Sequence, residues 1–318
     1  MIYRTLGKTG VMLSVIGMGG HEYLPNGKSR GFNENFELAI QPGYIFEGFG
    51  QDARKQVLQT AFENGINFFD VTHDSEKEAL GRNLQEIKPP YPIYVQTRPE
   101  GMVYHYDPSN TKMARYDLLR AEVQRILKLL RRERLEFLNL AFMQEALDHD
   151  PDYLAKIRDN VANLKKEGLI QFACADTFSG EATYLRQIDT GCFDAIYINY
   201  NFADHAPQRK VLPLARERGL GVIAREAFMK GELFQMAAEA GIEDKSRLAN
   251  AALKWLLTQE PVTNVILGTG KTAHLLSSLQ ILADLSLDDE EQELIEWIKT
   301  SATYRAYESA KLREFLRP

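Results

Sequence analysis

Short apolar runs alternate with amphipathic helical stretches along almost the whole chain, and this alternation constrains the fold more than any other feature. The apolar runs predict strands at residues 14–17, 67–70, 93–98, 137–142, 170–175, 195–199, 221–224 and 264–267. Helical spacing of apolar residues follows them near residues 52–64, 76–86, 114–131, 151–166, 180–190, 207–218, 246–259 and 272–284. Because the runs are mostly apolar, we expect parallel strands that are covered on both faces.

Strand–helix units that follow one another without a linker predict a single domain over residues 1–318. The expected fold class is α/β, a (β/α)8 TIM barrel, rather than an open doubly wound sheet. The lack of a Gly-x-Gly-x-x-Gly motif after an early strand agrees with this prediction. Residues 1–13 predict a β-hairpin that covers the barrel floor, and residues 291–300 and 303–318 predict a C-terminal helical extension.

The segment 20–52, between the first expected strand and the first expected helix, is far longer than the usual connection of this kind. Its aromatic residues are Tyr23, Phe32, Phe36, Tyr44, Phe46 and Phe49. In a barrel this segment lies at the C-terminal end of the strands, where active sites form. It is either a packed cap over a cavity or a surface excursion that packs on itself.

Composition limits the class of function. The net charge is −6 and the pI is about 5.7, which argues against nucleic acid or an anionic membrane as a partner. The N-terminus has no apolar signal region and no run is long enough to span a bilayer, so we expect a cytoplasmic protein. Cys174 and Cys192 have neither metal-site nor redox spacing, so no metal is predicted. The expected partner is a small-molecule substrate, and the oligomeric state stays open.

Several motifs together resemble those of the aldo/keto reductases. They are residues 3–10 (YRTLGKTG), 14–19 (SVIGMG), 64–70 (NGINFFD), the pairs Ser75-Glu76 and Leu80-Gly81, residues 163–170 (NLKKEGLI), and 265–271 (VILGTGK) with His274-Leu275. The matches extend from residue 3 to about residue 280 and are specific only in combination. This resemblance implies a TIM barrel and NADPH-dependent reduction of carbonyl compounds.

The resemblance also implies a catalytic tetrad of Asp, Tyr, Lys and His, in which the tyrosine protonates the carbonyl oxygen. Asp70 matches the aspartate, but no tyrosine follows it before Ser75. Arg98 stands in the place of the lysine, and Gln144 in that of the histidine. A guanidinium stays charged and suits a carboxylate or phosphate, so Arg98 either binds an anion or forms an ion pair with Asp70. His73 is a further candidate for proton transfer.

The residues that would read the nicotinamide amide also differ from the family pattern. Asp176-Thr177 stands after the fifth strand where the family has Ser-Asn, and Tyr197 stands where the sixth strand has Gln. Arg225-Glu226 follows the seventh strand, which often supplies an aromatic residue. We therefore place Asp176, Thr177, Tyr197 and Arg225 at the cofactor position and Glu226 among the catalytic candidates. The alternative is a local ion-pair network of Asp176 and Glu226 with Arg225.

The loop Gly268-Thr269-Gly270-Lys271 matches the place of the family's phosphate-binding loop. Its backbone N–H groups and the start of the following helix could hold a phosphate of NADP(H). The signal is weak by itself, because a strand-to-helix turn needs glycine in any case.

Three functions remain open from the sequence. The first is an oxidoreductase with NADP(H), in which Tyr23, Tyr44 or Tyr104 replaces the missing acid. The second is a non-redox lyase or isomerase for an anionic small molecule, which would use the charged residues at the strand ends. The third is a catalytically inactive barrel with a binding or regulatory role.

Overall fold

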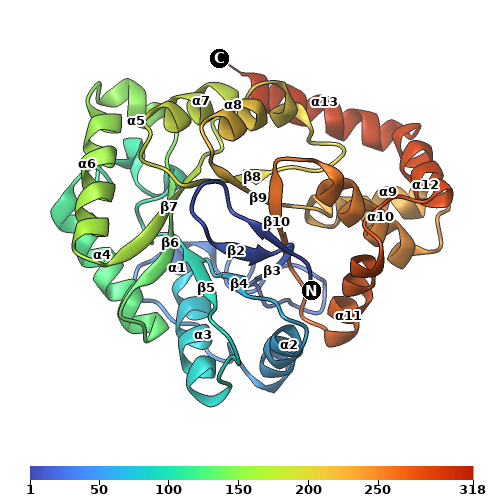
Figure 1. Cartoon of the computed structure of the whole chain (residues 1–318), viewed down its shortest axis with the longest axis horizontal. Coiled ribbons are helices and arrows are strands. Elements are labelled where there is room, and N and C mark those ends of the chain that lie inside the picture. Colours follow the sequence, from blue (N-terminus) through green and yellow to red (C-terminus); the bar gives the residue numbers. More distant parts are fainter. Residues whose placement is uncertain (318) are drawn as a thin grey trace.

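The apolar runs form a closed barrel in the computed structural model, which describes residues 1–317. The barrel strands are β3 (Ile16–Gly19), β4 (Phe68–Asp70), β5 (Tyr94–Thr97), β6 (Leu135–Ala141), β7 (Ile170–Asp176), β8 (Ala195–Asn199), β9 (Gly221–Arg225) and β10 (Val262–Leu267). Neighbours along the chain pair in parallel, and β10 pairs with β3 to close the ring (Figure 1). The predicted (β/α)8 barrel is therefore confirmed.

The helices lie outside the barrel and follow the predicted order (Figure 1). They are α1 (Phe36–Ala39), α2 (Asp52–Glu63), α3 (Asp74–Glu86), α4 (Tyr116–Leu130), α5 (Gln144–His149), α6 (Tyr153–Lys166), α7 (Glu181–Asp189), α8 (Val211–Glu217), α9 (Glu232–Glu239), α10 (Lys245–Thr258), α11 (Thr272–Leu279), α12 (Asp289–Lys299) and α13 (Ala302–Leu316). The sequence predicted all of these except the short helices α1, α5 and α9. Among residues 1–317, no helix combines the length and apolar character that a bilayer crossing requires.

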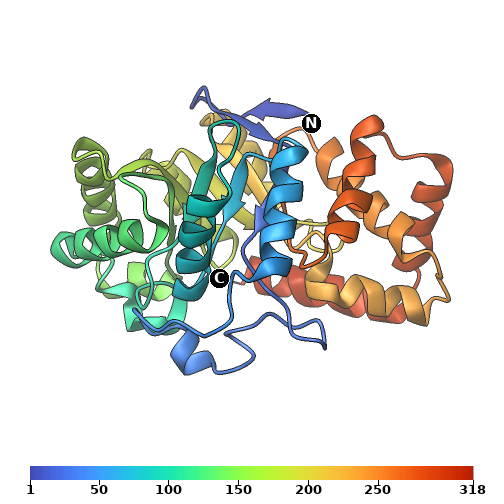
Figure 2. The same cartoon turned by 90° about the horizontal axis from the view of Figure 1, so that it is seen from below.

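Strands β1 (Tyr3–Thr5) and β2 (Met12–Ser14) form the predicted antiparallel hairpin. Leu6 and Leu13 are fully buried from the hairpin side and belong to the cluster inside the barrel, with Phe68 and Phe137 from the strands. Figure 2 shows this hairpin at one end of the barrel and the segment that carries α1 at the other. The hairpin thus closes the floor and leaves the C-terminal ends of the strands as the mouth.

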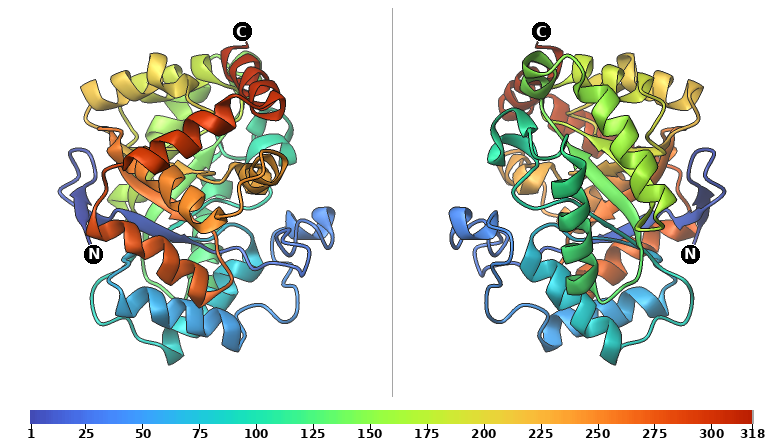
Figure 3. Two further views of the ribbon diagram at one scale, coloured as in Figure 1. Left: turned by 90° about the vertical axis from the view of Figure 1, so that its right-hand side faces the viewer. Right: turned by 90° about the vertical axis from the view of Figure 1, so that its left-hand side faces the viewer.

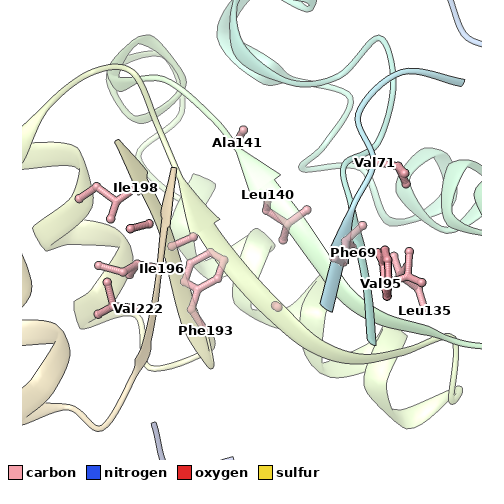
Figure 4. Packing of buried hydrophobic residues seen from close by; sticks show 14 of the residues in the cluster. Phe69, Val71, Val95, Leu135, Leu140, Ala141, Phe193, Ile196, Ile198 and Val222 are labelled. Carbon is pink, nitrogen blue, oxygen red and sulfur yellow. The ribbon is translucent and has the colours of Figure 1, made fainter. Parts of the chain in front are cut away.

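A second apolar layer separates the barrel from its helices. Alternate strand residues such as Phe69, Val95, Leu140 and Val222 point outward and are fully buried there (Figure 4). These apolar contacts on both faces explain why the strand sequences show no polar alternation. The resulting rigid scaffold fixes the strand ends, which hold the polar residues described below.

The segment 20–52 and helix α13 are the two additions at the mouth. The segment projects from the barrel on the side away from the hairpin (Figure 3). Its rings Phe32, Phe46 and Phe49 pack around His73, with ring centroids 5.2, 6.3 and 5.2 Å from the imidazole. The segment therefore packs on the mouth rather than only on itself.

Helix α13 lies over the loop that follows β7. The ring of Phe315 packs against Tyr184 at 6.3 Å, and Arg317 donates a hydrogen bond to the Phe178 carbonyl oxygen. Beneath this helix lies a small open pocket of about 40 Å³, lined in part by Thr177, Phe178 and Asp204. The C-terminal extension thus covers one side of the mouth.

Candidate active site

Asp70 lies at the end of β4, where it accepts two hydrogen bonds inside the mouth. The Tyr197 hydroxyl donates to Oδ2 at 2.7 Å, and Gln96 Nε2 donates to Oδ1 at 3.0 Å. Burial raises the pKa of Asp70, and these two hydrogen bonds oppose the rise only in part. The predicted Asp70–Arg98 ion pair is wrong, because the carboxylate faces Tyr197 and Gln96 instead.

Tyr197 brings a phenol to Asp70 from an unexpected direction. The sequence showed no tyrosine after Asp70 on its own strand, whereas Tyr197 comes from β8 and reaches the carboxylate from across the barrel. Burial and the charge of Asp70 raise the pKa of Tyr197 well above its usual value. The hydroxyl of Tyr197 donates its hydrogen bond to Asp70, so it is poorly suited to protonate a substrate.

Asp176, at the end of β7, is the centre of a saturated hydrogen-bond network. Arg225 Nη2 and Nη1 bind its Oδ1 and Oδ2 at 2.8 and 2.9 Å, which is a bidentate ion pair. Tyr104 donates to Oδ2 at 2.7 Å, and Asn139 donates to the same atom at 3.2 Å. Asp176 is fully buried, and no oxygen of its carboxylate is free to read a ligand amide.

The Arg225 guanidinium also lies against two aromatic rings. Its carbon Cζ lies 4.5 Å from the centre of the Tyr197 ring and 4.9 Å from that of Phe178. Thr177 is buried as well, and its hydroxyl accepts a hydrogen bond from the backbone N–H of Ser179. Of the residues that the sequence assigned to the cofactor, Asp176 and Arg225 therefore bind each other.

His21 and Glu76 form a pair at the mouth that the sequence analysis did not single out. His21 Nδ1 lies 2.7 Å from Glu76 Oε1, and the other carboxylate oxygen of Glu76 accepts a hydrogen bond from the backbone of Thr72 at 2.7 Å. The His21 side chain remains 36% exposed, whereas that of Glu76 is 1% exposed. The signal in the sequence was a polar residue directly after the glycines that end β3.

The charges around His21 favour its protonated form. Burial alone would lower the pKa of His21, but the negative charge and hydrogen bond of Glu76 outweigh this and raise it. The nearby carboxylate of Asp70 acts in the same direction, and Arg98 opposes it. The two histidines hold the pKa of Glu76 well below its usual value despite burial. His21 is thus a partly exposed imidazole, oriented by an ionised carboxylate.

His73 and Gln144 are positioned less favourably for contact with a substrate. His73 is 1% exposed inside its cage of phenylalanines, with Nε2 3.1 Å from Glu76 Oε1. Gln144 begins α5, where it accepts a hydrogen bond from Thr183 and donates one to Asp148. The Gln144 amide is therefore engaged within the protein, whereas His73 is enclosed by aromatic rings without a hydrogen bond to its ring nitrogens.

Glu226 also departs from the predicted ion-pair network. It pairs with Lys230 at 3.2 Å rather than with Arg225, so that part of the prediction is wrong. Its backbone has a φ of 63°, which is unusual for a residue with a side chain and is often found at functional sites.

Arg98 follows β5, with its guanidinium among three aromatic rings. Its Cζ lies 5.7 Å from the ring centre of Phe32, 5.1 Å from that of Tyr104 and 5.3 Å from that of Tyr106. The nearest carboxylate contact is Glu100 Oε1, 3.8 Å from Nη2. Glu100 is itself bound to the buried Lys77 at 3.2 Å. Arg98 is therefore close to the mouth, and its only carboxylate contact within the described residues is the long ion pair with Glu100.

The phosphate-loop residues lie between β10 and α11. Gly268, Gly270 and Lys271 are exposed, whereas Thr269 is buried and accepts a hydrogen bond from the Lys271 backbone. A Cβ atom at Gly268 would lie 2.3 Å from the Tyr23 hydroxyl, so this hydroxyl approaches the glycine closely. Tyr23 thus lies over the loop rather than beside Asp70, and burial raises its pKa to about 12.

These contacts test whether NADP(H) fits the site. Asp176 and Arg225 stand at positions that the family resemblance assigns to nicotinamide recognition, and here they are paired with each other. The residues in this arrangement therefore do not fit the cofactor in the family's manner. Among residues 1–317, no cluster of His, Cys, Asp and Glu has the arrangement of a metal site.

Comparisons with known proteins agree with the fold and give the family. The model of the aldo/keto reductase family matches residues 43–299. L-galactose dehydrogenase from Arabidopsis thaliana is 22% identical over 325 aligned positions, which cover 92% of this chain and 91% of that protein. The holo structure of an aldo-keto reductase from Bacillus halodurans superposes with a TM-score of 0.69 at 17% identity, over 97% of this chain and 99% of the other. The chain therefore belongs to the aldo/keto reductase family of oxidoreductases.

Proposed function

We propose that this protein is an oxidoreductase that acts on a hydroxyl or carbonyl group of a small molecule, with His21 as the group that moves the proton. The pair of His21 and Glu76 is the observation that carries the proposal. An imidazole that is partly exposed, held at Nδ1 by a buried carboxylate, can give or take a proton through its other nitrogen. It lies at the barrel mouth, within the electrostatic influence of Asp70.

The family supports oxidoreduction as the reaction class. The related protein named L-galactose dehydrogenase is, by its name, a dehydrogenase of L-galactose, and it is similar along most of this chain. In the family's reaction a tyrosine serves as the acid. Here the phenol at Asp70 is bound to that carboxylate, which leaves His21 as the better proton carrier.

The cofactor is the sharpest test of this proposal. We expect titration with NADPH, followed by cofactor fluorescence, to show weak binding by the wild type. Binding should be tighter in D176S/R225Y, in which family-like residues replace the Asp176–Arg225 pair. Absence of binding by both proteins at millimolar cofactor would reject NADP(H) as the hydride carrier.

The role of His21 is tested by turnover. A screen of hydroxy and carbonyl compounds against NAD(P)(H) supplies a substrate, and His21→Asn is expected to lower kcat by about 10²–10⁴. His105→Asn is a matched control, because His105 is exposed on the turn Tyr104–Tyr106. A His21→Asn protein that turns over like the wild type would reject the role of His21.

A second candidate function is supported by the ion pair between Asp176 and Arg225. A lyase or isomerase needs the same proton carrier but no hydride acceptor, and the Asp176–Arg225 pair would then be a permanent part of the site. Incorporation of deuterium from D₂O into a hydroxycarbonyl compound without any cofactor, and its loss in His21→Asn, would favour this candidate over oxidoreduction.

A further inference from the structure

One edge of the Arg98 guanidinium has no hydrogen-bond partner. Atoms Nε and Nη2 are buried and have no acceptor, and the whole side chain is only 9% exposed. The contact of Nη2 with Glu100 Oε1 is 3.8 Å, which is too long for a hydrogen bond. A buried charged donor without an acceptor destabilises a protein, so this edge is suited to an acceptor that comes from outside.

The neighbouring carboxylates leave the Nε N–H of this edge without an acceptor. Asp70 accepts from Tyr197 and Gln96, and Glu100 Oε2 accepts from Lys77. Glu100 Oε1 faces Nη2, but only across the long 3.8 Å contact. The chain thus leaves a charged group unsatisfied beside its own active site.

The two unpartnered atoms determine which anion fits. The N–H groups on Nε and Nη2 point in the same direction from one side of the guanidinium, and their spacing matches the two oxygens of a carboxylate. The rings of Phe32, Tyr104 and Tyr106 lie 5.1–5.7 Å from Cζ. Such a narrow aromatic surrounding suits a planar carboxylate better than a tetrahedral phosphate.

Phe32 links this edge to the proposed proton carrier. Its ring contacts the imidazole of His21 at 6.0 Å between centroids and also lies over Arg98. Phe32 belongs to the segment 20–52, which covers the mouth from outside. Phe32 is therefore the ring that adjoins both Arg98 and His21.

We propose that the substrate carries a carboxylate, which binds side-on to Nε and Nη2 of Arg98 when Phe32 moves aside. This inference rests on the proposed function, because it assigns a substrate class to the same mouth. The expected substrates are small hydroxy or oxo acids, whose reacting oxygen lies near the carboxylate and therefore near His21.

A three-carbon series tests the inference by binding alone. D-glycerate, glycerol and glycerol 3-phosphate share a three-carbon backbone. At one end they carry a carboxylate, an uncharged hydroxymethyl group and a phosphate ester, respectively. Titration of the whole protein, followed by the ¹⁵N–¹H signal of Arg98 Nε, should shift that signal with D-glycerate and not with glycerol. The Phe32→Ala variant should bind D-glycerate more tightly than the wild type, because the edge is uncovered.

Arg98→Lys keeps the positive charge but lacks the two parallel N–H groups that bind a carboxylate side-on. It should therefore weaken D-glycerate binding at least about tenfold, as measured by calorimetry. Arg115→Lys, at an exposed ion pair with Asp117, is the matched control and should bind like the wild type. Equal affinity of the wild type and Arg98→Lys, no binding by either the wild type or Phe32→Ala, or tighter binding of glycerol 3-phosphate would overturn the inference. Binding of D-glycerate at Arg98 in a protein without turnover would instead reject only the proposed function.

Discussion

At the scale of single residues, the carboxylate of Glu76 lies close to two histidines. Its Oε1 lies 2.7 Å from Nδ1 of His21 and 3.1 Å from Nε2 of His73. A carboxylate at this distance stabilises an imidazolium and fixes which ring nitrogen is turned toward it. The arrangement places a histidine with a raised pKa, His21, at the mouth.

We expect Glu76→Gln to lower the pKa of His21, since the variant removes the negative charge that raises it. The measurement is an NMR pH titration of the histidine ring signals, with the His21 signal assigned through His21→Asn. Glu78→Gln is the control on the same helix, because Glu78 pairs with Arg82 and not with a histidine. An unchanged His21 titration in Glu76→Gln would contradict the assignment.

Arg225 is expected to be a structural residue as well as a barrier to the nicotinamide. Arg225→Met leaves the buried Asp176 charge without its main partner and should lower the free energy of unfolding by about 3–5 kcal/mol. Chemical denaturation measures this value. Arg247→Met removes an exposed pair with Asp288 and should change the free energy of unfolding by about 1 kcal/mol or less.

The double variant R225M/D176N separates charge burial from packing. It removes both charges, so its loss of stability should be smaller than that of Arg225→Met alone. A double variant that is less stable than Arg225→Met would show that the ring contacts of Arg225, rather than its charge, dominate.

At the scale of elements, the predicted strands and helices were confirmed because each carries a local signal. Apolar runs and helical periodicity show which face of a segment packs against the core. In a barrel each strand–helix unit packs against two similar units, so this local signal is enough. The strand boundaries shifted most at β3, which begins at Ile16 because Ser14 pairs with β1 instead. Helix α1 has four residues, too few for its apolar spacing to be detected.

Helix α13 depends on a close approach to the loop after β7. Gly180 has a φ of 83° and a ψ of −162°, which only glycine adopts readily, and a Cβ there would lie 2.3 Å from the Phe315 carbonyl oxygen. Gly180→Ala should therefore destabilise the protein by about 2–4 kcal/mol and increase amide exchange at the end of α13.

Gly191→Ala is the matched control for this prediction. Gly191 also has a positive φ, of 69°, but nothing lies within 4 Å of its added Cβ. We expect a loss of about 1–2 kcal/mol from the backbone alone and no change in exchange at α13. Equal exchange in the two variants would mean that α13 does not depend on Gly180.

At the scale of the whole molecule, burial of Asp204 ties stability to pH. Burial raises the pKa of this carboxyl from 3.8 to about 7, so the folded state binds the proton more tightly than the unfolded state. The stabilisation is fully present below about pH 4 and is lost as the pH rises to about 7. The free energy of unfolding should fall by about 2–4 kcal/mol across this window from this group alone.

Chemical denaturation between pH 4 and pH 8 tests this dependence. Asp204→Asn should remove this slope, whereas Asp189→Asn, at an exposed ion pair, should keep it. The raised pKa of His21 acts in a higher window, because its stabilisation is present below its unfolded value near 6.5 and is lost as the pH rises through its folded value. An unchanged slope in Asp204→Asn would contradict the assignment to Asp204.

The sequence by itself determined the barrel, its floor hairpin and its family, because these features follow from local periodicity and from short motifs along the chain. Only the tertiary structure decided which side chains meet. Tyr197 reaches Asp70 from a strand 127 positions away, Asp176 binds Arg225 across 49 positions, and His21 finds Glu76 across 55. The order of residues along the chain does not reveal the distances between side chains at different strand ends. The closure of the barrel brings these side chains together.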